Sequence, residues 1–245
     1  MNYLKPVLKY PASFDKAQFK KAKCLLTISV GQEVHEGDKF AATIELVNDS
    51  FGSCVMLIDD TLQRHSMALD KKEEAEFFYN ASLLAGDLWL QRNKIYYQQL
   101  GILETIIRWD KWLTHPHYFL SQEKIKQLIR EDAAYSQSFD ATIEEFLRRY
   151  YLRLTQQEDF DWERAKRLCF NYLIEECTAL CLWPELNCQF EVYPNKRNLA
   201  MHETHQKLVI PHYADLLHAI AIKFKHRKQF KPQQFQSNPI IEELL

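Results

Sequence analysis

The chain contains only five glycines in 245 residues, which limits the nucleotide-binding motifs that it can carry. Neither the GxGxxG fingerprint nor the GxxxxGK(S/T) loop occurs, so the backbone cradle for a pyrophosphate or triphosphate is missing. No apolar run approaches the roughly eighteen residues of a membrane span, and the amino-terminal residues lack the apolar block of a secretory signal. We therefore expect a cytoplasmic protein that binds neither a dinucleotide nor a membrane.

The six cysteines include no CxxC pair, and several lie in apolar segments where a reduced cysteine behaves as a small hydrophobic side chain. We expect neither a disulfide framework nor a structural metal site. The net charge of -2 argues against a surface generally coated with nucleic acid, because such binding depends on Lys and Arg. A local basic patch remains open.

The apolar content of 47% is sufficient for a large core, and no repeat, low-complexity tract or linker divides the chain. We therefore predict a single α/β domain over residues 1–245. Its core is expected at about 24–228, with extensions at 1–23 and 229–245.

Apolar strand-like runs alternate with helical patterns along the chain. Strands are expected at 24–30, 54–60, 103–112 and 188–194. Helices are expected at 38–48, 71–100 with Gly101 as its cap, 121–131, 140–154, 161–182 and about 213–227. This order predicts a Rossmann-like parallel sheet with helices on both faces and an added helical layer. Ligands of such sheets bind at the carboxyl ends of the strands, where the strand order reverses.

The first predicted strand lies in the stretch "CLLTISVGQ" at 24–32. Its apolar run stops on Ser29, at the strand end where this rule places ligands. The stretch holds half of the GxSxG elbow of serine hydrolases, because Thr27 occupies the first glycine position. A serine hydrolase of the α/β type is therefore one alternative. Its histidine base would be His202, His205, His212 or His218.

Two further motifs have competing interpretations. The "HETH" motif at 202–205 contains two histidines and a glutamate, but it lies in a predicted loop without a third ligand, so a solvated turn is favoured over a metal site. The basic run "KFKHRKQFK" at 223–231 fits a phosphate-binding surface and equally fits a solvated helix end, whose cations suit the helix dipole.

In the predicted helix at 161–182, Tyr172 and Glu176 are four residues apart and share one stripe beside an otherwise apolar surface. A carboxylate on such a face needs a partner. An ion pair with lysine or arginine is the simpler interpretation. A functional carboxylate that holds an ammonium group or relays a proton is the alternative.

Three segments together resemble the cyclodipeptide synthases, a family that uses aminoacyl-tRNAs to make diketopiperazines. The segment "ISVGQ" is similar to the family's strand-end nucleophile motif, "NYLIEECTALCLW" to its Tyr-x-x-x-Glu helix, and "FEVYPNK" to its later strand that ends in a second tyrosine. The resemblance runs from about residue 24 to 212. It implies a fold similar to class I aminoacyl-tRNA synthetase catalytic domains, without amino-acid activation, so no ATP and no cofactor are expected.

By the family's scheme, Ser29 attacks the ester carbonyl of a first aminoacyl-tRNA and keeps the aminoacyl group as an ester. A second aminoacyl-tRNA then donates its amino group, and the free amine of the dipeptidyl-enzyme closes the ring. The resemblance assigns Glu176 to the ammonium of the bound aminoacyl group and Tyr172 to its neighbouring hydroxyl. It assigns Tyr193 to stabilising the intermediates and to proton transfer. The vicinal hydroxyl of the tRNA is a candidate for moving the serine proton.

The chain departs from the better-known branch of the family, because Gln32 replaces a common asparagine and Pro194 follows the second tyrosine. It resembles the branch with Tyr-Pro at this position, and Gln32 is a candidate for orienting Tyr193. Side-chain pockets are expected at the strand ends. Candidate substrate-binding residues are Thr27, Gly31, Gln32, Val55 and Leu57.

The tRNA surface is expected to differ from that of the better-known branch, whose long helix after the second strand is rich in arginine. Here that helix offers Arg92 and Lys94, and the surface is expected to add Lys196, Arg197 and the run 223–231. The leading interpretation is thus a monomeric, tRNA-dependent cyclodipeptide synthase. A serine hydrolase and a non-catalytic tRNA-binding module are the alternatives, although the presence of all four candidate catalytic residues argues against the module.

Overall fold

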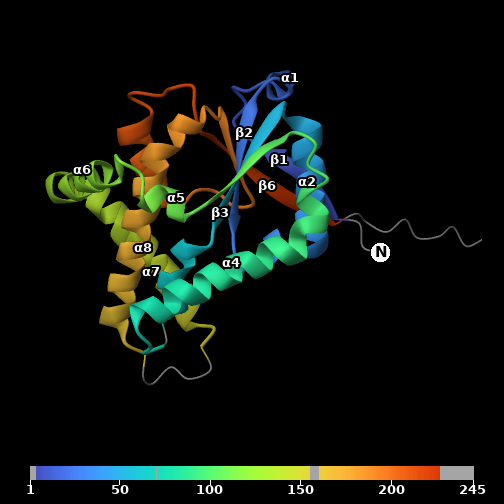
Figure 1. The fold of residues 1–245 in the computed structure, drawn as a ribbon. Coiled ribbons are helices and arrows are strands. Elements are labelled where there is room, and N and C mark those ends of the chain that lie inside the picture. Colours follow the sequence, from blue (N-terminus) through green and yellow to red (C-terminus); the bar gives the residue numbers. More distant parts are fainter. Residues whose placement is uncertain (1–3, 70, 155–159, 227–245) are drawn as a thin grey trace, which may run out of the picture.

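The computed structural model describes residues 4–69, 71–154 and 160–226, and a six-stranded sheet runs through it in the order β1-β6-β5-β2-β3-β4 (Figure 1). The strands are β1 (Leu4–Lys9), β2 (Lys23–Ser29), β3 (Ser53–Asp59), β4 (Leu103–Arg108), β5 (Phe190–Tyr193) and β6 (His218–His226). Neighbouring strands are parallel except β1, which runs antiparallel to β6. This arrangement confirms the predicted Rossmann-like sheet.

Helices cover both faces of the sheet, with α2 on one side and α6, α7 and α8 on the other (Figure 1). The helices are α1 (Lys16–Phe19), α2 (Gly37–Ser50), α3 (Arg64–Met67), α4 (Ala75–Tyr97), α5 (Asp110–Leu113), α6 (Tyr118–Glu131), α7 (Ala133–Tyr151), α8 (Trp162–Leu182) and α9 (Leu199–Thr204). Side chains of α1, α2 and α4 share one core with Leu26 of β2, whereas those of α5 to α9 share the other core with Leu25.

The strand order reverses at β2. The chain runs from β2 through β3 to β4 on one side, and then returns to place β5 and β6 on the other. Ser29 ends β2 at this reversal, which is the position where ligands bind in open α/β sheets.

Side-chain alternation brings three polar groups to one face of the sheet, beneath α8. Leu25 belongs to the core under α8, so the period of two along β2 puts Ser29 on the same face. Leu57 of β3 belongs to that core too, which puts Asp59 beside Ser29. The same alternation in β5 adds Tyr193. The fold therefore gathers a hydroxyl, a carboxyl and a phenol at one edge.

Two predictions for the carboxyl-terminal part are wrong. In place of the helix expected at about 213–227, residues 218–226 form β6, because Ile220 and Ile222 alternate into the core, each 2% exposed, with Ala221 between them. The interpretation of the basic run as a helix end is therefore wrong for residues 223–226, and residues 227–231 lie outside the described residues. Residues 202–205 are not a solvated turn: α9 includes the first three, and His205 is buried in the π-helical turn that follows.

Other element boundaries differ from expectation for local reasons. The sequence predicts helices at 121–131 and 140–154 with a break between them near residues 135–138. In the structure α7 already includes these residues, because Asp132 caps its start by accepting a bond of 3.0 Å from Tyr135 N. Helix α4 starts at Ala75 and ends at Tyr97, ahead of Gly101, because its last turns tighten into i to i+3 bonds. The strand expected to reach residue 112 ends at Arg108. Within the extension expected at 1–23, residues 4–9 form β1 and join the sheet.

No helix within the described ranges is both long enough and apolar enough to cross a membrane.

Candidate active site

Ser29, Asp59 and Tyr193 meet at the carboxyl ends of β2, β3 and β5. Ser29 is the register partner of Asp59, and its hydroxyl donates a hydrogen bond of 2.9 Å to Asp59 Oδ2. The Tyr193 hydroxyl lies 3.1 Å from Ser29 Oγ, and it is the donor of this bond because the serine proton points at Asp59. The serine oxygen therefore lies between one group that can accept a proton and one that can supply it.

The turn after β2 depends on Gly31. Its φ is +88°, and the turn is closed by a bond of 3.2 Å from Gln32 N to Ser29 O. A Cβ at Gly31 would meet nothing within 4 Å, so the backbone conformation, and not the available space, requires glycine. The turn carries the chain sharply away from the serine and leaves its hydroxyl on the α8 side.

His35 holds the backbone of Ser29. Its Nδ1 lies 3.0 Å from Ser29 N and 3.2 Å from Ser29 O, so the ring contacts both polar atoms of the serine backbone. Burial lowers the pKa of His35 to about 4, which keeps the ring neutral at physiological pH. Trp89 of α4 fixes His35 in turn by donating Nε1 to its carbonyl oxygen at 3.0 Å. His35 thus positions the serine and does not contact its hydroxyl.

Helix α8 supplies Tyr172 and Glu176, one turn apart, above these strand ends. Burial raises the pKa of Tyr172, and the negative charges of Glu176 and Asp59 raise it further. Burial likewise raises the pKa of Tyr193, with Asp59 and Glu176 again contributing. These mutual effects show that the helix residues and the strand-end residues share one electrostatic environment.

Glu176 is held by an asparagine, and no cation pairs with it in the part of the chain that the structure describes. Its Oε2 accepts a bond of 3.0 Å from Asn198 Nδ2, while Asn198 Oδ1 caps α9 by accepting from Met201 N at 2.8 Å. The cap fixes the orientation of the amide and turns its donor toward Glu176. Burial raises the pKa of Glu176 to about 7, with Glu191 adding to the increase, against the lowering effects of Asn198 and Tyr172. The carboxyl group is therefore partly ionised near neutral pH.

The adjacent Glu175 has the opposite environment. Its carboxylate accepts from Arg64, with one bond of 2.9 Å, and from Trp109 Nε1 at 2.7 Å, and His65 lies 3.3 Å away. Burial would raise the pKa of Glu175, but hydrogen bonds from His65 and Arg64 outweigh it, so the pKa is lowered. The ion pair that the sequence analysis considered for Glu176 thus belongs to its neighbour.

Asp59 and Asp60 form a second pair of this kind. Asp60 accepts from Arg108 Nε at 2.5 Å and caps the following turn through Thr61 N at 2.8 Å. Asp59 accepts from Ser29 through Oδ2, and its buried Oδ1 has no hydrogen-bond partner within the described ranges. Burial raises the pKa of Asp59 well above its ordinary value, and the charge of Glu176 raises it further.

Comparison with known proteins identifies the family. The chain is 40% identical to a cyclodipeptide synthase (CDPS) from Fluoribacter dumoffii, with a TM-score of 0.88 over 93% of this chain and 100% of that one. The chain belongs to the cyclodipeptide synthase family. No family model matches it, and none of the curated proteins does.

Two more distant structures share the fold of this synthase family member. One is a cyclodipeptide synthase from Candidatus Glomeribacter gigasporarum bound to Phe-tRNAPhe, at 17% identity and a TM-score of 0.68, covering 90% of this chain and 94% of that one. The other, from Mycobacterium tuberculosis, is described as relating these enzymes to type I tRNA synthetases; it has 9% identity and a TM-score of 0.56, covering 84% of this chain and 86% of that one.

The structure brings Ser29 and Tyr193 into contact, and the charges of Asp59 and Glu176 act on both Tyr172 and Tyr193, so the four residues stay the candidate site. The histidine base of a serine hydrolase does not appear, because the hydroxyl of Ser29 bonds to Asp59 and Tyr193. His218 lies at the other end of the sheet, where β6 begins. The geometry thus disfavours the hydrolase alternative.

The candidate substrate-binding residues lie on β2, on the neighbouring strand β3 and in the turn after β2, and they differ in exposure. Thr27, Val55 and Leu57 are at most 4% exposed on the α8 side of β2 and β3. Gly31 and Gln32 are exposed in the turn. Within the described ranges, the side chain of Gln32 makes no hydrogen bond to Tyr193, whose hydroxyl bonds to Ser29 instead. The role of Gln32 in orienting Tyr193 therefore stays a prediction.

The four residues predicted to contact tRNA also differ in exposure and in pairing. Arg197 forms an ion pair with Glu191 in which the two side chains are only 6% and 5% exposed, so it stabilises the fold and is not a surface contact. Arg92 pairs with Glu36 at the start of α2. Lys94 and Lys196 are exposed. In the run 223–231, residues 223–226 belong to β6 and the rest lie outside the described residues.

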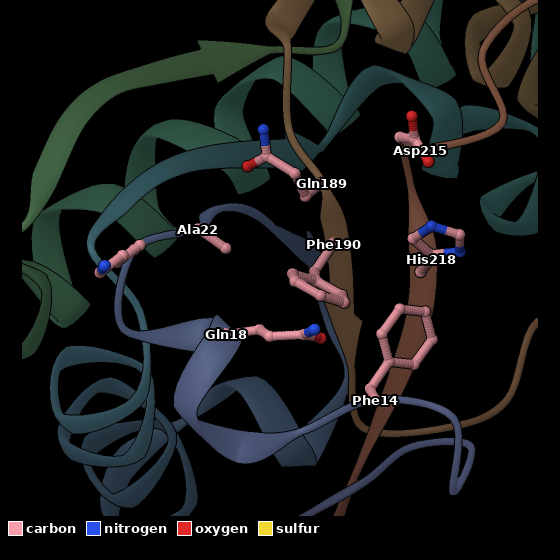
Figure 2. Close-up of a pocket in the computed structure, with 8 residues that line it drawn as sticks. Phe14, Gln18, Ala22, Gln189, Phe190, Asp215 and His218 are labelled. Atoms are coloured by element: carbon pink, nitrogen blue, oxygen red, sulfur yellow. The ribbon is translucent and has the colours of Figure 1, made fainter.

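Two hollows flank the sheet. One of about 480 Å³ adjoins the site through His65, whose ring lies 6.4 Å from that of Tyr172, and is also lined by Arg64, Tyr79 and Arg164. The other, of about 400 Å³, is lined by Phe14, Phe190 and His218 (Figure 2). It lies at the amino ends of the parallel strands, opposite Ser29.

Three site residues were missed by the sequence analysis: Asp59, His35 and Asn198. The sequence does carry a signal for Asp59. In both "CLLTIS" and "CVMLID", the polar residue that ends the strand lies five positions after a cysteine. Cys24 and Cys54 are register partners, so the two ends coincide in space. His35 and Asn198 carry no comparable signal, because their roles depend on tertiary contacts.

Proposed function

We propose that this chain makes cyclic dipeptides from two aminoacyl-tRNAs by a ping-pong mechanism through aminoacyl-Ser29 and dipeptidyl-Ser29 intermediates. The observation that carries the proposal is the position of Ser29 Oγ, 2.9 Å from Asp59 Oδ2 and 3.1 Å from the Tyr193 hydroxyl, at the point where the strand order reverses. An activated ester substrate supplies the driving force, and the covalent intermediate divides the reaction into easier steps.

Glu176 fits the proposed ammonium site. Its carboxyl is partly ionised near neutral pH and, within the described ranges, it forms no ion pair with a lysine or arginine. A substrate ammonium would supply the missing positive charge, which lowers the pKa of Glu176 and strengthens the attraction. Tyr172, one turn earlier on the same face, is the neighbouring hydroxyl. Tyr193 can donate a proton to Ser29 Oγ as it becomes the leaving group in ring closure.

The proposal extends to substrate contacts. Val55 and Leu57 end the apolar face beneath Ser29, and Thr27 narrows that face toward small side chains, so we assign these residues to the first aminoacyl pocket. Lys94 and Lys196 remain candidates for tRNA contact. Tyr193 followed by Pro194 fits the Tyr-Pro branch of the family. The enzyme would act as a cytoplasmic monomer without a cofactor.

The test is expression of the chain in a bacterium, followed by mass spectrometry of the medium for diketopiperazines. We expect products from the wild-type chain and none from Ser29→Ala. The matched control is Ser136→Ala, at a half-buried position of α7, which should produce as the wild type does. Products from Ser29→Ala at wild-type levels would contradict the mechanism. Absence of products, with aminoacyl-tRNA binding retained, would favour the non-catalytic module.

A further inference from the structure

Among the residues that the structure describes, Asp59 is the one carboxyl group that bonds to the proposed nucleophile. Ser29 donates to Asp59 Oδ2 at 2.9 Å, and the register of β2 and β3 pairs the two residues directly. Both are 6% exposed, so water competes little for the bond. The two groups are fixed to neighbouring strands of the central sheet, which limits their relative motion.

The surroundings of Asp59 do not suit a purely structural carboxylate. Among the described residues, the other buried carboxylates are paired with arginine: Asp60 with Arg108, Glu175 with Arg64 and Glu191 with Arg197. Asp59 forms no ion pair among the residues that the structure describes, and its buried Oδ1 has no partner. A buried carboxylate without compensation costs stability, so its retention needs another reason.

We propose that Asp59 is the general base that accepts the proton of Ser29 during formation of the aminoacyl-enzyme. This inference rests on the proposed function and adds a catalytic residue to it. No histidine contacts the serine hydroxyl within the described ranges, and Asp59 Oδ2 lies at hydrogen-bond distance from Ser29 Oγ. Burial raises the pKa of Asp59, which makes its carboxylate a stronger base than an exposed aspartate.

The step balances without any further reactant. Ser29 Oγ bonds to the carbonyl carbon of the ester while its proton passes to Asp59 Oδ2. The bond between that carbon and the ribose oxygen then breaks, and the proton held by Asp59 passes to the ribose oxygen. The products are aminoacyl-Ser29, a tRNA with a free terminal hydroxyl, and the regenerated Asp59 carboxylate. Tyr193 donates to Ser29 Oγ at the start and is unchanged at the end.

The experiment measures the rate at which aminoacyl-tRNA transfers its aminoacyl group to Ser29, by acid quench and intact-protein mass. The variant Asp59→Asn keeps an oxygen that accepts the serine hydrogen bond but cannot take the proton. We expect its acylation to be about 10² to 10⁴ times slower than that of the wild type, with thermal stability retained. Wild-type acylation by Asp59→Asn would overturn the inference.

Two further measurements separate chemistry from structure. Asp59→Ala should regain acylation when formate is added, because formate can enter the space left by the side chain and accept the proton. Lack of rescue in folded Asp59→Ala would argue against the base. For the wild type, we expect a solvent deuterium isotope effect of about 2 or more on acylation. An isotope effect near 1 would overturn the inference. Because it is measured on the wild type, this test does not depend on whether either variant folds.

The failure of this inference is distinguishable from failure of the proposed function. A wild-type protein that gains no aminoacyl mass at Ser29 would overturn both. Rapid acylation of both the wild type and Asp59→Asn would overturn the role of Asp59 alone and leave the covalent mechanism standing.

Discussion

Replacing Glu176 by glutamine should make the folded protein more stable above neutral pH. The pKa of Glu176 is raised from 4.5 to about 7, so on a rise in pH the unfolded chain loses this proton before the folded one does. Folding stability therefore decreases as the pH rises from about 4.5 to 7, and the full penalty is present above pH 7. Glutamine cannot ionise and escapes this penalty.

The two pKa values set the size of the effect. A shift from 4.5 to about 7 corresponds to about 3 kcal/mol at high pH, an upper bound because Glu176 is only partly buried by surface area. Linkage places roughly 2.5 kcal/mol of this change between pH 5 and pH 8. The difference in free energy of unfolding between Glu176→Gln and the wild type should therefore grow in favour of the variant over that interval.

Glu175→Gln provides the matched control, one residue away on the same helix. The lowered pKa of Glu175 means that its ionised form stabilises the fold above about pH 4.5, and that this contribution is lost as the pH falls through the folded pKa. Removing it leaves Arg64 unpaired and should cost about 3 kcal/mol at pH 8. The two variants are thus expected to differ from the wild type in opposite directions at pH 8.

The assay is urea unfolding, monitored by tryptophan fluorescence, at pH 5, 6, 7 and 8. The slope of the unfolding free energy against urea concentration is compared between the proteins. Glu176→Gln should also lose diketopiperazine synthesis while it gains stability, as expected when a functional carboxylate is removed. If Glu176→Gln is less stable than the wild type at pH 8, Glu176 is a structural group and the reasoning is refuted.

Further variants test the groups around the serine. Asn198→Asp keeps the cap of α9 but replaces the donor to Glu176 with a negative charge, so the rate of cyclic dipeptide formation should fall at least about tenfold and its pH profile should shift upward. His35→Phe leaves the buried Ser29 N–H without an acceptor and should cost about 1–3 kcal/mol in urea unfolding; no loss would contradict its positioning role. Gly31→Ala at a φ of +88° should lower unfolding free energy by about 1–2 kcal/mol, and unchanged stability would refute the strained-turn argument.

Periodicity along the chain predicts those parts of the site that lie within one element. Tyr172 and Glu176 share a helical stripe, and Ser29 closes an apolar strand, so each could be found without coordinates. The partner of Ser29 is different. Asp59 is 30 residues away, and only the register between β2 and β3 brings it to the hydroxyl.

The environment of a single side chain also could not be predicted from the sequence. The two residues of each doublet, Asp59-Asp60 and Glu175-Glu176, are chemically identical in the sequence. The direction of each side chain decides which of the two meets an arginine. The helix predicted at about 213–227 is a strand at 218–226, and the alternation that a strand produces is visible in Ile220, Ile222 and Phe224.

The most direct test of the account is the chemical state of Ser29 after the protein meets a single kind of aminoacyl-tRNA. The mixture is quenched in acid and digested, and the peptides are mapped by mass. We predict one aminoacyl group on the peptide that contains Ser29, absent from Ser29→Ala. An adduct on another residue, or none while diketopiperazine still forms, would contradict the central claim that Ser29 is the nucleophile.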